Sequence, residues 1–166
     1  MTTIQKDKYI FSVDIEKTKE YYKTLPLCDC PYCRNYYRQI KDKLPKLDAF
    51  LKEFGVNISK PDEIFSIEMD NYIDYINVYY TVCGNIKSMG KHEINLYDHS
   101  LLNIAITDDF SPPNEQTEAY FVISVMGIKL PWVLEEPFPT TDDPFPTTKE
   151  KISEKLKNYF KKLFNK

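Results

Sequence analysis

Glycine is scarce in this chain, with four residues among 166, at positions 55, 84, 90 and 127. Phosphate-binding loops need several glycines close together, because the backbone N–H groups must approach the phosphate. The sequence also lacks a Gly-x-Ser-x-Gly turn, which presents the nucleophilic serine in many hydrolases. These absences disfavour nucleotide binding through the common motifs and serine-based catalysis.

Long apolar runs are absent as well. No stretch of about 18 uncharged apolar residues occurs that could span a membrane, and the first residues lack an apolar segment of signal-peptide length. Of the four cysteines, three lie within six residues, too close together for a framework of long-range disulfides. The sequence therefore predicts a cytoplasmic protein with no membrane span, whose thiols are free or bound to metal.

Net positive charge is confined to the carboxyl-terminal segment. The formal net charge is −3, but residues 149–166 hold seven Lys and two Glu, for a net charge of +5. Residues 1–148 consequently carry a net charge of −8. Because nucleic-acid binding needs basic surface to neutralise phosphates, we do not expect nucleic acid as a partner of the acidic body.

The residues that are plentiful indicate a globular domain. Apolar residues make up 42% of the chain and charged residues 28%, which is typical of a single folded domain at this length. Apolar side chains recur at intervals of three and four from Tyr32 to Phe54, with Pro45 in between. This spacing predicts two consecutive helices, the second beginning at Pro45 and capped by Gly55. A shorter helix is predicted over residues 17–23, ending before Pro26.

Alternation of apolar and polar residues predicts several strands, over residues 9–15, 64–69, 76–83, 93–97, 101–107 and 119–130. The links between the later strands are short and lack helical signals, which favours antiparallel pairing. The expected fold class is α+β: an amino-terminal strand and helices packed on an antiparallel β-sheet or small β-sandwich, followed by a carboxyl-terminal amphipathic helix.

The expected domain organisation follows from the proline distribution. Residues 1–134 are predicted to form one α+β domain. Residues 135–148 contain the repeated sequence PFPTT and four prolines, which favour an extended, semi-rigid linker. Residues 149–166 carry apolar residues at helical spacing among many lysines, and predict a basic amphipathic helix.

Three thiols, Cys28, Cys30 and Cys33, cluster at the start of the predicted main helix. Amides at a helix amino terminus stabilise thiolates, the form of cysteine that binds metal or attacks disulfides. The spacing C-x-C-x2-C supplies three soft ligands for Zn²⁺, the one cofactor that the sequence indicates. A tetrahedral site needs a fourth ligand, for which the candidates are Cys83, His92 and His99.

Two other interpretations of the cluster stay open. The string Cys30-Pro31-Tyr32-Cys33-Arg34 resembles the active site of glutaredoxins, which implies that Cys30 attacks and Cys33 resolves the mixed disulfide. That match covers five residues, and the buried strand, Thr-Val-Pro segment and Gly-Gly pair of the family are missing around it. The third interpretation is that the thiols pack as small apolar groups; we rank it level with the metal site and ahead of redox chemistry.

Four longer segments are similar to a group of uncharacterised proteins from Gram-positive bacteria; they are CDCPYCRNYY, GVNISKPDEI, YYTVCG and LPWVLEEPFP. The resemblance implies a bacterial cytosolic protein and no particular activity. The predicted function is therefore a binding or interaction protein, more probable than an enzyme, with zinc at the cysteine cluster. The alternatives are a thiol–disulfide oxidoreductase or redox sensor, and a metal-free protein whose sheet and proline-rich linker dock a protein partner.

Overall fold

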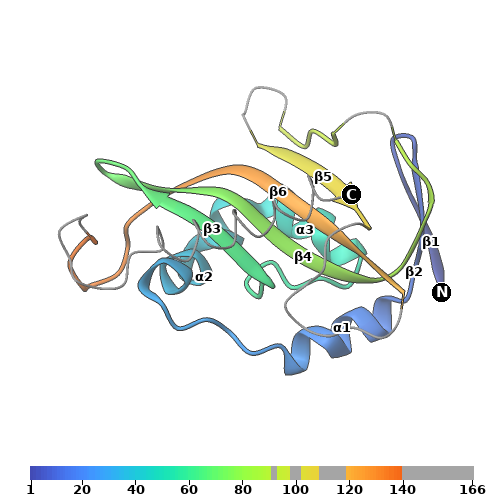
Figure 1. The fold of residues 1–166 in the computed structure, drawn as a ribbon, viewed down its shortest axis with the longest axis horizontal. Helices are drawn as coiled ribbons and strands as arrows, with labels where there is room; N and C mark the ends of the chain where they lie inside the picture. The colour runs from blue at the N-terminus through green and yellow to red at the C-terminus, as the bar shows by residue number, and fades with distance from the viewer. Residues whose placement is uncertain (91–92, 98–101, 109–118, 140–166) are drawn as a thin grey trace, which may run out of the picture. The chain divides into compact units, whose positions relative to one another are not determined.

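The computed structural model describes residues 1–90, 93–97, 102–108 and 119–139. The chain divides into two compact units, Met1–Glu135 and Glu136–Lys166. The first unit has the α+β fold that the sequence predicts, with helices packed on an antiparallel sheet (Figure 1). In chain order its described elements are β1 (Thr2–Lys6), β2 (Tyr9–Val13), α1 (Ile15–Thr24), α2 (Pro31–Lys43), α3 (Pro45–Glu53), β3 (Glu63–Glu68), β4 (Tyr72–Ser88), β5 (Asn103–Thr107) and β6 (Tyr120–Pro131).

The six strands form one sheet in which all pairs are antiparallel, in the order β1-β2-β4-β6-β5, with β3 also paired to β4. Strand β4 is the longest strand and organises the sheet. Residues 72–83 of β4 pair with β6 along one edge. Along its other edge, β4 pairs first with β3 and then, at residues 84–88, with β2. Of the two expected arrangements, the structure has the single sheet.

The helices begin and end at residues whose chemistry explains the boundaries. Asp14 caps α1, because its side chain accepts a hydrogen bond from the Lys17 N–H at 3.1 Å. Pro45 occupies the first turn of α3, where no helical N–H is required, and this confirms the predicted division into two helices. Gly55, with φ of +83°, ends α3. The Val56 N–H donates to the Leu51 carbonyl and the Gly55 N–H to that of Lys52, which is the Schellman pattern expected of a glycine cap.

Buried tyrosines join the helices to the sheet. The Tyr36 hydroxyl of α2 lies 2.6 Å from that of Tyr80 in β4, and Tyr80 donates to the Ile58 carbonyl at 2.8 Å. Tyr22 of α1 donates to the Thr81 carbonyl at 2.8 Å. A buried hydroxyl without a partner would be costly, so these bonds specify how each helix is placed on the sheet.

Several sequence predictions need correction. The structure has an additional edge strand, β1, which the sequence analysis missed, and β4 begins at Tyr72 rather than at residue 76. Residues 93–97 do not form a strand; they contribute one isolated bridge, between Ile94 and Ile104. Ile15 begins α1 instead of ending the preceding strand.

The predicted linker and terminal helix fall mainly outside the described residues. Residues 137–139, the described start of the repeat, have no regular secondary structure. Residues 140–166, and with them the expected amphipathic helix, are not among those that the structure describes. In the described part of the chain, no helix combines the length and the apolar character needed to cross a bilayer.

Candidate metal centre

The three clustered cysteines lie where the loop after α1 turns into α2. Cys30 is the residue that caps α2, with an extended backbone (φ −72°, ψ 154°), and Pro31 is at the start of the helix. Cys28 belongs to the preceding loop and Cys33 to the first turn of the helix. Proline suits this position because it needs no N–H partner, so the sequence Cys-Pro itself fixes where the helix begins.

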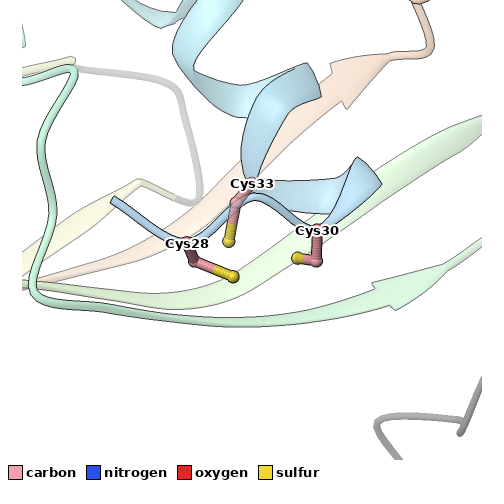
Figure 2. Close-up of side chains that lie close together, drawn as sticks. All are labelled: Cys28, Cys30 and Cys33. Carbon is pink, nitrogen blue, oxygen red and sulfur yellow. The ribbon is translucent and has the colours of Figure 1, made fainter. Parts of the chain in front are cut away.

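The sulfur atoms of these residues converge. Every pair among the Sγ atoms of Cys28, Cys30 and Cys33 lies within 4.8 Å. Figure 2 shows the three side chains turned toward a common point beside the start of the helix. Their burial is graded: Cys28 is exposed, Cys30 intermediate, and Cys33 buried. A soft ion or reagent could therefore reach the group from the side of Cys28.

The electrostatic surroundings shift the pKa values of Cys30 and Cys33 in opposite directions. Hydrogen bonding from the Cys33 thiol, with smaller contributions from the Cys33 N–H, the Cys28 thiol and the Tyr32 N–H, lowers the pKa of Cys30 to about 5 against the opposing effect of burial. The same interaction with Cys30, followed by burial, raises the pKa of Cys33 well above its usual range. At neutral pH, Cys30 is thus a thiolate and Cys33 its proton donor.

Two tyrosines complete the surroundings of the cluster, and the sequence analysis named neither of them. Burial raises the pKa of Tyr37, and the nearby sulfurs raise it further, with Cys33 contributing most. Burial also raises the pKa of Tyr75, whose hydroxyl donates to the Tyr32 carbonyl at 2.8 Å. Tyr37 could have been identified from the sequence, because it lies four residues after Cys33 on the same helix face.

Polar contacts hold the start of α2 in place. The Arg34 guanidinium hydrogen-bonds the carbonyl of Asp29, in the middle of the cysteine sequence, and lies 3.4 Å from its carboxylate. The Asn35 amide donates to the Tyr75 hydroxyl and to the Pro131 carbonyl, both at 3.1 Å. The cluster is therefore built on a helix terminus that is fastened to the sheet.

The structure does not bring Cys83 to the cluster. Cys83 is buried near the other end of β4, where its N–H donates to the Thr18 hydroxyl at 3.1 Å. Eight residues separate it from Tyr75 along the strand, which corresponds to roughly 26 Å at the rise of an extended chain. A zinc–sulfur bond is about 2.3 Å long, so Cys83 lies too far from the cluster to be the fourth ligand. The other candidates, His92 and His99, lie outside the described residues.

The geometry of the group fits a thiophilic ion. Sulfurs around a tetrahedral zinc are about 3.8 Å apart, given the usual zinc–sulfur distance. Sulfurs already within 4.8 Å of one another need only small side-chain rotations to reach that spacing. Cys30, at the helix amino terminus, is already in the thiolate state that a metal requires, whereas Cys33 must release its proton when a metal binds. Cys28, Cys30 and Cys33 can thus coordinate a metal ion.

Comparisons with protein-family models, with curated proteins and with solved structures gave no match to this chain. The similarity to uncharacterised proteins of Gram-positive bacteria stays a prediction from the sequence.

Proposed function

We propose that the protein is a non-enzymatic binding protein of the bacterial cytosol, in which Cys28, Cys30 and Cys33 hold one Zn²⁺. The observation that carries the proposal is the convergence of three sulfurs within 4.8 Å. The ion links the loop after α1 to the first turn of α2, and so fixes the helix start against the sheet. One tetrahedral position is left for His92, His99 or a ligand supplied from outside.

Metal analysis of protein purified without chelator tests this proposal. We expect about one zinc per chain. Cys28→Ser and Cys33→Ser should each lose most of the metal, whereas Cys83→Ala, which removes a buried thiol away from the cluster, should retain it. Substitution of Co²⁺ should give thiolate-to-cobalt charge-transfer absorption in the wild type and in Cys83→Ala. Folded protein that contains no zinc and does not take up Zn²⁺ or Co²⁺ on titration would falsify the proposal.

A second candidate function, thiol–disulfide exchange, is favoured by the opposite pKa shifts of Cys30 and Cys33. The Cys30 thiolate would attack one sulfur of a substrate disulfide and release the other as a thiolate. Cys33 would then attack the Cys30 sulfur, passing its proton to the departing substrate thiolate. The first substrate thiolate takes a proton from water, so the substrate disulfide is reduced to two thiols, and the protein is oxidised to a Cys30–Cys33 disulfide. This is the division of roles that the glutaredoxin resemblance implies.

A further inference from the structure

A cavity of about 510 Å³ is present on the helical side of the first unit, away from the cysteines. Residues of all three helices and of the loop after α3 line it. Its charged side chains are five lysines and one carboxylate; they are Lys19, Lys23, Lys41, Lys52, Lys60 and Asp48.

This concentration of positive charge contrasts with the rest of the body, since residues 1–148 have a net charge of −8. Ammonium groups gathered around one cavity repel one another, although the cavity opens to solvent. A bound anion relieves that repulsion, so the cavity is electrostatically prepared for negative charge.

The existing partners of the lysines are weak or leave donors free. Three of them pair with a carboxylate one helical turn away; the pairs are Glu16–Lys19, Glu20–Lys23 and Asp48–Lys52. Solvent screens the first two pairs, whereas Asp48 is buried and its pair with Lys52 is partly shielded. Lys60 differs, because it is less exposed and its Nζ donates to the Tyr22 carbonyl at 2.8 Å. That bond holds the ammonium group at the cavity wall and uses one of its three N–H donors.

We propose that this cavity binds a small molecule carrying two or more phosphate groups. Its volume falls within the range of about 300–1,000 Å³ that small-molecule sites occupy. Lysine binds phosphate as a point charge, and several lysines around one space match an anion of high charge density better than a single carboxylate. A cavity of this size, although it opens to solvent, gathers its charge around one space, which suits a compact ligand better than it suits an extended nucleic-acid backbone.

Calorimetric titration of the full chain with inorganic pyrophosphate tests the proposal. We expect saturable binding to one site that weakens as the salt concentration rises. The double variant Lys41→Gln with Lys60→Gln should lose at least about tenfold in affinity for pyrophosphate. The matched control, Lys87→Gln with Lys129→Gln, removes the same charge from exposed positions of β4 and β6 and should bind as the wild type does.

Thermal unfolding of each variant establishes that the protein is folded under the conditions of the titration. Equal weakening in both double variants would mean a general charge effect and would overturn the assignment to the cavity. Absence of pyrophosphate binding at millimolar concentration, or binding of a single-stranded oligonucleotide in its place, would also overturn it.

Discussion

Cys30 and Cys33 are three residues apart, yet the pKa of one lies far below and that of the other far above the ordinary thiol value. The difference comes from position: Cys30 caps α2 and accepts hydrogen bonds, whereas Cys33 is buried in the first turn and donates one. Two chemically identical side chains are thereby made unequal by their relation to a helix terminus.

Alkylation of Cys30 should reveal this inequality. In reduced, metal-free protein, the rate of reaction of Cys30 with iodoacetamide should rise with a midpoint near pH 5, as the pKa of about 5 requires. Cys33→Ala removes the leading hydrogen-bond donor and should move the midpoint upward by about one pH unit or more. Peptide mass spectrometry measures the site-specific rates, with Cys28 in the same sample as a comparison. A wild-type midpoint near 8.5, the value of a free thiol, would dismiss the redox candidate.

The cluster itself could be predicted from the sequence, because three cysteines within six residues at a helix start are necessarily close together in space. The neighbours from distant segments could not. Tyr75 reaches the cluster from β4, which requires knowledge of how α2 is placed on the sheet. Cys83 looked suitable as a ligand because of its residue type, but strand β4 carries it far from the site.

At the scale of elements, α2 depends on a polar attachment in its second and third turns. The side-chain oxygen of Asn35 accepts from the Val133 N–H at 2.9 Å, while its amide nitrogen donates to Pro131 and Tyr75. Gln39, one turn later, donates to the same Pro131 carbonyl at 2.8 Å. These bonds tie the helix to the end of β6, and the Asn35 and Gln39 side chains that make them are buried, so loss of a bond leaves a buried polar group poorly solvated.

Asn35→Ala should therefore destabilise the protein by about 2–3 kcal/mol, since it leaves the Val133 N–H without its partner and opens a space in the interior. Urea unfolding followed by circular dichroism measures the change. Arg38→Ala, at an exposed position of the same helix, is the control and should alter stability by less than about 0.5 kcal/mol. Equal stabilities for the two variants would show that the attachment contributes little.

Helices were easier to predict than strands for a physical reason. Spacing of three and four over many residues, with proline and glycine at the ends, identifies α2 and α3 locally. Strand β1 buries only Ile4 among its five residues, so its sequence has almost no alternation to detect. Its pairing depends instead on a tight turn in which Asp7 adopts a positive φ of 50°.

For the whole molecule, the choice of tyrosine as a core residue has an electrostatic consequence. Four tyrosines are almost completely buried, and burial raises the pKa of each above the model-compound value of 10.0; they are Tyr22, Tyr36, Tyr75 and Tyr80. Between the unfolded-state pKa and the higher folded-state pKa, the folded protein holds more protons than the unfolded chain. Stability is consequently complete below about pH 10 and falls as the pH rises through that window.

Alkaline titration should show this coupling. The four buried tyrosines should ionise above pH 10, together with the loss of near-ultraviolet circular dichroism. Tyrosinate absorbance counts the ionised groups, and protein in concentrated urea, in which all thirteen tyrosines are solvated, serves as the reference. Ionisation of all thirteen near pH 10 with the circular dichroism intact would contradict the expected coupling.

The lysine-lined cavity also belongs to this scale, and no local pattern could have predicted it. Its lysines come from three helices and a loop, and most lie in helical segments where lysine normally indicates a solvated face. Only the packing of α1 beside the loop after α3 brings them around one space. The lysine content of residues 149–166 can be read directly from the composition. Nothing in the sequence indicates that lysines gather around one space within the acidic body.

The pairing of β2 with β4 connects residues 10–13 to residues 84–88. During synthesis the amino-terminal hairpin leaves the ribosome while its partner, more than 70 residues downstream, has not yet been translated. At about 5–20 residues per second this delay lasts several seconds. Throughout that time one edge of β2 presents unpaired N–H and C=O groups, so the nascent chain is open to aberrant strand pairing at this hairpin.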